Sequence, residues 1–232
     1  MALNIEDYAI IGDCQTAALV GRDLSVDWLC WPRFDSAACF ANLLGTRENG
    51  RWVIEPEKPG AKFTRAYRGH TLILDTMIET ADGAALVTDF MPLDGHGSHL
   101  VRLVRGISGT VRLRTELIIR FDYGSAVPWV RRRDDGSLHA IAGPDRLVLR
   151  TPVKLRPHGR THIGELLVTA GETTEFTLSY GLSYEDLPKP IDPYEALAQT
   201  ERGWGEWSRP SETAGQWSEA VIRSLLTLRA LI

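Results

Sequence analysis

The chain has 232 residues, of which 44% are hydrophobic and 24% charged, and its formal net charge is −4 at pH 7. This composition is typical of a globular protein large enough to bury a core, and the acidic balance gives no reason to expect a nucleic-acid partner. The sequence contains no apolar run of about 18 residues and no basic region followed by a long apolar stretch, so neither a membrane span nor a signal peptide is predicted.

The cysteines and histidines give no sign of a metal site. Cys14, Cys30 and Cys39 are odd in number and lack the spacing of metal ligands, which favours reduced, mostly buried thiols in a reducing compartment. His96 and His99 lie in the glycine-rich segment DGHGSH, which is more typical of a turn than of a metal site. We therefore expect a cytoplasmic protein without a metal or another cofactor.

From residue 8 to residue 180 the chain alternates short apolar runs with Gly, Pro and Asp turns, which is the pattern of β structure. The predicted strands are residues 8–11, 16–20, 26–31, 51–55, 62–67, 71–80, 84–90, 100–106, 110–121, 127–132, 138–142, 146–150, 163–170 and 175–180. Asp82-Gly83 and Asp135-Gly136 are typical hairpin turns. A single helical interruption is predicted over residues 38–44, ending at Gly45. The fold class is therefore mainly β, a large antiparallel sandwich rather than a parallel α/β sheet.

After residue 180 the pattern becomes helical. LPKPIDP, residues 187–193, indicates a semi-rigid linker, and a helix is predicted over residues 194–202 with Asp192 as its N-cap and Pro193 at its first position. A second helix is predicted over residues 216–232, with one apolar face formed by Trp217, Val221, Leu225, Leu228 and Ile232. Because this apolar helix stops without a polar tail, we expect the chain to be a fragment of a longer protein.

Residues 25–40, SVDWLCWPRFDSAACF, combine large aromatic side chains with charges that are costly to bury unpaired. One interpretation is a strand that leaves its sheet after Trp31 through a Pro-Arg turn, which places Arg33 and Asp35 at an edge where another surface can use them. The other is a core strand whose two charges form a local arginine–carboxylate pair. The residues alone leave both open.

Two segments resemble a known family. Residues 7–45, DYAIIGDCQTAALVGRDLSVDWLCWPRFDSAACFANLLG, and the following GRWVIEP closely resemble the N-terminal domain of bacterial glycoside hydrolase family 15 proteins, the glucoamylase-like and trehalase-like enzymes. W-x2-W at residues 204–207 and GQWSEAVIRSLLTLRAL at residues 215–231 look like the linker and first helix of their catalytic barrel.

The resemblance implies a super-β-sandwich over residues 1–187, a linker over residues 188–215 and, over residues 216–232, the first helix of an (α/α)6 barrel that the chain otherwise lacks. The family inverts the anomeric carbon while it hydrolyses α-glucosidic bonds, with two catalytic glutamates on the barrel. No catalytic residue is therefore expected here, and the chain alone is expected to be inactive. Its own carboxylates supply no substitute pair, because Asp13 and Asp23 lie in turn contexts where aspartate bonds its own backbone. Three further carboxylates, Glu201, Glu206 and Glu212, read as solvated charges.

The resemblance also implies that the sandwich packs on the barrel near its sugar-binding end, with residues 31–35 the segment most suited to reach that interface. Arg33, beside Asp35, would then pair with a barrel carboxylate or fix the pocket opening. Trp28 or Trp31 could present a ring to a glucose unit, although a tryptophan on a strand more often packs in a core. The implied partners are the chain's own C-terminal barrel and an α-glucoside whose identity the residues do not indicate.

Two other classes remain open. One is an independent carbohydrate-binding module, which presents exposed aromatic side chains to sugar rings. The other is an interaction domain whose tryptophan-rich segment, residues 204–232, binds another chain. Because large exposed apolar patches are rare on monomers, we expect self-association or disorder of that segment when the chain is isolated.

Overall fold

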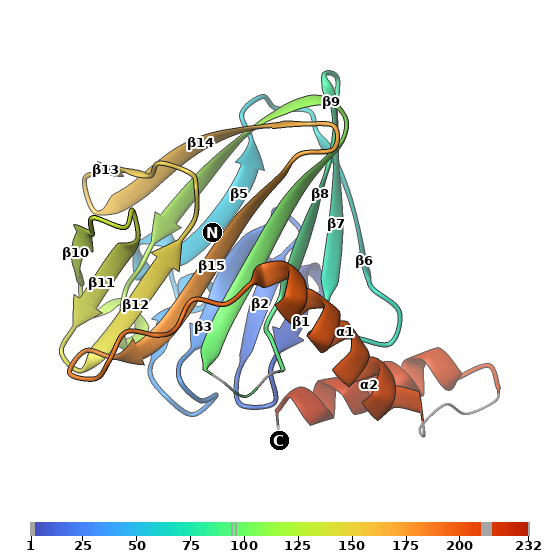
Figure 1. Cartoon of the computed structure of the whole chain (residues 1–232). Helices are drawn as coiled ribbons and strands as arrows, with labels where there is room; N and C mark the ends of the chain where they lie inside the picture. Colours follow the sequence, from blue (N-terminus) through green and yellow to red (C-terminus); the bar gives the residue numbers. More distant parts are fainter. Residues whose placement is uncertain (1–2, 94, 96, 210–214, 232) are drawn as a thin grey trace.

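The computed structural model describes residues 3–93, 95, 97–209 and 215–231. Figure 1 shows a strongly twisted body of antiparallel strands with two helices lying against one side of it. The predicted mainly β fold with helices near the C-terminus is confirmed.

The strands are β1 (Tyr8–Gly12), β2 (Ala17–Gly21), β3 (Ser25–Cys30), β4 (Ala38–Phe40), β5 (Arg51–Pro56), β6 (Lys62–Tyr67), β7 (Leu74–Thr80), β8 (Gly83–Phe90), β9 (Ser98–Ile118), β10 (Trp129–Arg132), β11 (Leu138–Ala142), β12 (Asp145–Arg150), β13 (Arg156–His158), β14 (Thr161–Thr169) and β15 (Thr173–Leu182). The helices of the described residues are α1 (Pro193–Ser208) and α2 (Ser218–Ala230), with short 3-10 turns η1 (Ile5–Asp7), η2 (Asn42–Leu44), η3 (Arg47–Asn49) and η4 (Asp122–Gly124).

Strand β9 joins the two layers of the sandwich. Its first half pairs with β8 and β15, and its second half pairs with β5 and β14, all antiparallel. One layer therefore holds β1 to β5 with β13 and β14, and the other holds β6 to β8, β10 to β12 and β15. The hydrogen-bonded path β1-β2-β3-β5-β9-β15-β12-β11-β10 ends at β10, so that strand lies at one border of the sheet.

The first half of β9 is buried on both faces. Leu100 and Val104 point into the main core between the layers, whereas Val101 and Leu103 join a second cluster that includes Ala196 of α1. Because successive strand residues point to opposite faces, this segment reads as a continuous apolar run rather than an alternation.

A buried ion pair lies in the space between the layers, and its arginine reaches the opposite layer. Arg102 of β9 and Asp89 of β8 are both fully buried, and Arg102 Nε lies 2.8 Å from Asp89 Oδ1. The same guanidinium donates to the carbonyl oxygens of Trp52, at 3.0 Å, and Leu24, at 2.7 Å, in the opposite layer. Its charge is therefore compensated and its donors are used, as a buried arginine requires.

Most predicted strands are present, with three differences. The helix predicted over residues 38–44 is wrong, because Phe40 and Ala38 pair with Leu29 and Cys30 of β3 and only η2 is helical. Strand pairing thus overrides the local propensity of an alanine-rich segment. The separate strands predicted over residues 100–106 and 110–121 are one strand, and β13 was not predicted.

The glycines inside β9 explain why the sequence suggested a break there. A Cβ on Gly106 would lie 2.1 Å from the Thr169 carbonyl oxygen, and one on Gly109 would lie 2.2 Å from the Asp82 carbonyl oxygen. Gly109 also has a φ of 58°, which L-residues rarely adopt. These glycines permit close approach of neighbouring backbone rather than a chain reversal.

Helix α1 begins as predicted and ends later than predicted. The Asp192 carboxylate accepts hydrogen bonds from the backbone N–H groups of Tyr194 and Glu195, and Pro193 occupies the first helical position. This is the expected N-cap chemistry. The helix continues through Trp204 to Ser208 rather than ending at residue 202, and Trp204 is buried.

Helix α2 packs through a different face from the one predicted. Ile222, Leu226 and Ala230, spaced four residues apart, are buried with Trp204 and Leu72. The predicted face remains largely outward, because Trp217, Val221 and Leu228 are exposed, Leu225 is only half-buried and Ile232 lies outside the described residues. We call Trp217, Val221, Leu228 and the exposed Leu231 the outer face of α2.

Two contacts select the buried face of α2. Arg223 lies over the Tyr67 ring, at 3.9 Å from its centroid, and donates a 2.7 Å hydrogen bond to the Thr71 carbonyl oxygen. Near the other end, a Cβ on Gly12 would lie 3.1 Å from the Ala230 Cβ, so the glycine at residue 12 lets β1 and α2 approach closely without displacing Ala230.

Candidate functional site

The loop after β3, residues 31–37, is fixed by contacts with Tyr180 of β15 and with Gln15 in the turn before β2. Trp31 is only 3% exposed and packs on Tyr180 with ring centroids 6.3 Å apart. The backbone N–H of Phe34 donates to the Gln15 carbonyl oxygen at 3.0 Å, and that of Ser36 donates to the Arg33 carbonyl oxygen at 3.1 Å. The loop is therefore an ordered turn that leaves the sheet after a buried tryptophan.

Arg33 and Asp35 project from this turn and pair with each other. Arg33 Nε lies 2.9 Å from Asp35 Oδ1, and the two side chains are 64% and 57% exposed. The hydrogen bond from Arg33 lowers the pKa of Asp35 below its ordinary value, and its partner raises the pKa of Arg33. The local pair and the edge position, which were alternative interpretations of the sequence, are thus both present.

Trp28 and Trp31 each pack against a tyrosine ring. Trp28 is half-buried against Tyr123, with ring centroids 6.1 Å apart. Trp31 presents almost no surface to solvent, so its ring packs beneath the loop and is not available to stack on a sugar ring. Phe34, which sequence reasoning did not select, is the aromatic side chain of this loop that is exposed.

The 31–37 loop and the end of α2 lie at the same end of the domain. The loop bonds to Gln15 in the turn between β1 and β2, and the neighbouring Cys14 packs against the cluster that holds Ile222, Leu226 and Ala230. An exposed ion pair with Phe34 and the outer face of α2 are therefore both presented from this end.

The aspartates considered as candidates in the N-terminal segment are engaged in structural contacts. Asp13 Oδ1 accepts from the backbone N–H groups of Gln15 and Thr16, each at 2.9 Å, and Asp23 Oδ1 accepts from the Ser25 N–H at 3.1 Å. These are the turn roles predicted for them.

Two other candidate carboxylates of the described residues, Asp27 and Glu201, also make structural contacts. Asp27 accepts hydrogen bonds from the hydroxyl groups of Tyr8, at 2.7 Å, and Ser25. Glu201 pairs with Arg68 at 3.4 Å, and Glu212 lies outside the described residues. None of these described contacts resembles the two opposed carboxyl groups, roughly 6.5–9.5 Å apart around an open cleft, that inverting glycosidases use.

Thiols and histidines do not form a reactive centre in the part of the chain described. Burial raises the pKa of Cys30 to about 11 and that of Cys39 well above its ordinary value, so both remain protonated at neutral pH. His99 is buried with Nδ1 2.9 Å from the Ser179 hydroxyl, and His96 lies outside the described residues. Across the described ranges, no group of three or more His, Cys, Asp or Glu side chains could hold a metal ion.

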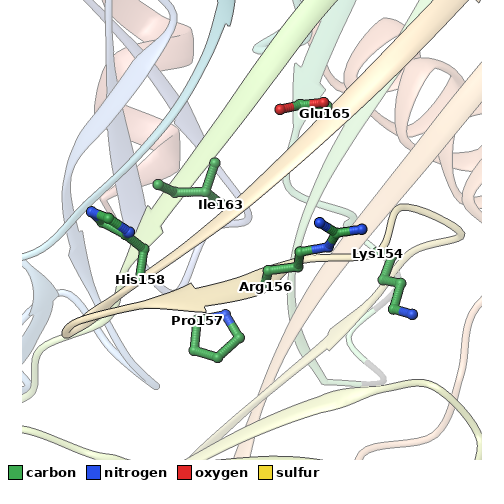
Figure 2. Close-up of a pocket in the computed structure, with 6 residues that line it drawn as sticks. All are labelled: Lys154, Arg156, Pro157, His158, Ile163 and Glu165. Carbon is green, nitrogen blue, oxygen red and sulfur yellow. The ribbon is translucent and has the colours of Figure 1, made fainter.

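Two surface hollows lie away from the 31–37 loop. The one drawn in Figure 2, of about 460 Å³ beside the hairpin of β13 and β14, is lined by Lys154, Arg156, Pro157, His158, Ile163 and Glu165. Figure 2 shows the Lys154 and His158 side chains pointing away from each other, and Glu165 is the one carboxylate of the lining. This hollow therefore lacks a converging acid/base pair.

The second hollow, of about 560 Å³, lies on the hairpin of β10 and β11 around Trp129. The sequence predicts residues 127–132 as one more strand, and Trp129 is not among the binding-site residues that it indicates. The available signal was the alternation of Val127, Trp129 and Arg131, which puts an aromatic and a cationic side chain on one strand face.

Comparison with known families decides which family this fold belongs to. The family model described as trehalase-like, N-terminal matches residues 1–165. The chain belongs to the trehalase-like N-terminal family. The glucoamylase-like and trehalase-like resemblance of the sequence is thereby confirmed at the level of this domain.

Relatives of this trehalase-like N-terminal domain are much longer than the chain. It is 29% identical to a trehalase of Mycolicibacterium smegmatis over 98% of the chain but 38% of that protein, and 24% identical to a trehalase of Thermoplasma volcanium over 98% of the chain and 37% of that protein. The chain thus spans less than two fifths of the length of these relatives.

Its fold is also that of part of a solved enzyme. A bacterial glucoamylase complexed with acarbose superimposes on 96% of the chain and 40% of its own, with a TM-score of 0.67 at 9% identity. At this identity the likeness establishes the fold alone. No helix within the described residues is long and apolar enough to cross a membrane.

Proposed function

We propose that this chain is the N-terminal structural and substrate-rim domain of an inverting α-glucosidic hydrolase of the trehalase or glucoamylase type, in glycoside hydrolase family 15. Residues 1–187 are the sandwich, residues 188–215 the linker and residues 216–232 the first helix of a catalytic (α/α)6 barrel that carries both glutamates. The family membership and the greater length of the trehalase relatives support this assignment.

The observation that carries the proposal is the two-sided character of α2. Ile222, Leu226 and Ala230 fix the helix to the sandwich, while Val221 and Leu228 remain exposed on the outer face. A helix that is apolar on opposite sides is suited to lie between two packed bodies. The proposal therefore makes α2 the element that the sandwich and the barrel share.

The 31–37 loop supplies the rim in this proposal. Arg33 and Asp35 are paired with each other and well exposed, so their pairing can be exchanged for contacts with a barrel residue or a substrate hydroxyl at little desolvation cost. The planar guanidinium of Arg33 suits a carboxylate partner, and Phe34 provides an apolar surface between the two charges. The α-glucoside is the substrate of the whole enzyme.

The test uses the full-length protein with Arg33→Ala and Asp35→Ala. We expect each substitution to lower kcat/KM for the α-glucoside by about tenfold, because a positioned charged contact contributes about 1.4 kcal/mol or more. Lys58 and Asp82 form a matched exposed pair, 2.8 Å apart on the β7–β8 hairpin side, and Lys58→Ala and Asp82→Ala serve as controls. If the Arg33 and Asp35 variants keep wild-type activity and melting temperature, the rim role is wrong.

We further propose that the protein is cytoplasmic and that the isolated chain self-associates. Three free cysteines, two of them buried, fit a reducing cytoplasm. When the chain is isolated, the outer face of α2 has no barrel to cover it, and we propose that two chains then associate through it.

A further inference from the structure

The hollow on the β10–β11 hairpin combines an exposed aromatic ring with two arginines that form no ion pair within the described part of the chain. Alternation along β10 puts Trp129 and Arg131 on one face, and pairing across to β11 sets Ile141 opposite Trp129 and His139 opposite Arg131. These side chains line the hollow together with Arg133 and with Val127, which lies just before β10. In Figure 1 this hairpin lies at the left of the molecule, whereas α1 and α2 lie at the lower right.

Trp129 is the feature that most needs an explanation. Its side chain is 77% exposed, whereas Trp31, Trp52 and Trp204 are buried, and it packs on no other aromatic ring among the described residues. Val127 and Ile141 extend the apolar surface around it. An indole held on a strand, with apolar neighbours, is a rigid platform for the apolar face of a flat ligand ring.

The charges around this platform are positive. Neither Arg131 nor Arg133 takes part in an ion pair with a described residue, while Arg132 turns to the other face and donates to the Leu155 carbonyl oxygen at 2.7 Å. The nearby Asp135 is occupied, because its Oδ1 accepts from the Ser137 hydroxyl at 2.5 Å. Asp134 borders the arginines but does not line the Trp129 hollow.

His139 adds an acceptor to the floor of the hollow. Since the Ser137 hydroxyl donates to Asp135, the contact of 3.0 Å between Ser137 Oγ and His139 Nε2 requires that Nε2 carry the proton. Burial, together with the nearby Arg133, lowers the pKa of His139, so the ring is neutral at pH 7 and Nδ1 is an acceptor.

We propose that this hollow binds an anionic saccharide, with a hexose ring stacked on Trp129 and its phosphate or carboxylate group held by Arg131 and Arg133. Residues two apart on a strand are about 6.8 Å apart, so the backbone of Arg131 lies about one sugar-ring length from that of Trp129, and Arg133 follows directly after β10. The hollow volume of about 560 Å³ suits a ligand of one or two rings. Arginine forks match carboxylate and phosphate oxygens, whereas a neutral glucan would leave both cations unused.

This site is independent of the proposed rim, so the test uses the 232-residue chain itself. Calorimetric titration compares glucose 6-phosphate, glucuronate, maltose and inorganic phosphate. We expect at least one of the two anionic sugars to bind at least about tenfold more tightly than both maltose and inorganic phosphate. The reason is that only an anionic sugar can both stack its ring on Trp129 and place a negative charge on the arginines. The tighter of glucose 6-phosphate and glucuronate identifies the anionic group.

Matched variants assign the binding to this hollow. Trp129→Ala and the double variant Arg131→Gln/Arg133→Gln are each expected to weaken binding by about tenfold. Trp217→Ala, which removes a tryptophan that is 70% exposed on α2, and Arg156→Gln, in the hollow of Figure 2, should leave it unchanged. The inference is overturned if neither anionic sugar binds at about 10 mM, if maltose or phosphate binds as tightly, or if the control variants lose binding equally.

Discussion

Replacement of Arg102 by methionine should strongly destabilise the sandwich. The side chain is fully buried and its guanidinium makes two hydrogen bonds to Asp89 and one each to the carbonyl oxygens of Trp52 and Leu24. Its removal leaves the Asp89 carboxylate buried without its counter-charge. Breaking a buried pair in this way costs about 3–5 kcal/mol.

The magnitude is to be measured by urea unfolding of wild type, Arg102→Met, Asp89→Leu and the double variant. A domain of this kind has a free energy of unfolding of about 5–15 kcal/mol, so the single variants should remain measurable but marginal. In the double variant no charge is left uncompensated, and its loss should be clearly smaller than the sum of the two single losses. Arg102→Lys is the control that keeps the charge but loses the planar fork, and it should fall between wild type and Arg102→Met.

Two outcomes would contradict this reasoning. If Arg102→Met lowers the free energy of unfolding by less than about 1 kcal/mol, the buried charges are not held as described. If the losses of the two single variants simply add, the residues do not act as a pair.

Three further predictions concern the helices and the hairpins. Leu226→Ala, in the buried contact of α2, should cost about 2–5 kcal/mol of the packing energy of that cluster and make residues 193–231 sensitive to protease before the sandwich unfolds; equal protease resistance would count against the packing. Val221→Glu together with Leu228→Glu, on the outer face, should reduce the mass of the isolated chain measured by light scattering to that of a monomer, and a chain already monomeric without them would refute self-association. Because burial lowers the pKa of His139 and His162 in the folded state, the unfolded chain binds more protons as the pH falls below about 6.5, so stability should decrease toward about pH 5. His139→Gln should flatten that decrease in urea titrations, and an unchanged slope would show that its ionisation is not coupled to folding.

Local chemistry made much of the fold predictable. The Asp192 cap with Pro193 sets the start of α1, and Asp82-Gly83 and Asp135-Gly136 lie at the two hairpins predicted for them. In each case the geometry is determined by a few neighbouring residues, so their identity is sufficient.

Features that depend on distant contacts were not predictable in the same way. The face of α2 that is buried is chosen by Gly12 and by the Tyr67 ring, which lie about 160 to 220 residues away in the chain, and the amphipathic pattern allowed either face. The pairing of Phe40 with Leu29 turned a helix-like segment into a strand. For the candidate site, the sequence indicated the position of Arg33 and Asp35, whereas the exposure of Trp129 depends on β10 being the last strand of the path.

The central position of β9 also restricts how the protein can be made. While the ribosome is still adding residues, β5 can pair with β3 and β8 with β7, but each lacks its second partner until residues 98–118 emerge, and the first half of β9 then waits for β15, which ends at Leu182. Such non-local pairing is slow and leaves apolar strand surface uncovered in the nascent chain. Val101 and Leu103 must in addition wait for Ala196 of α1. The strand order therefore keeps the sandwich incomplete until about the first 180 residues of the chain are available for pairing.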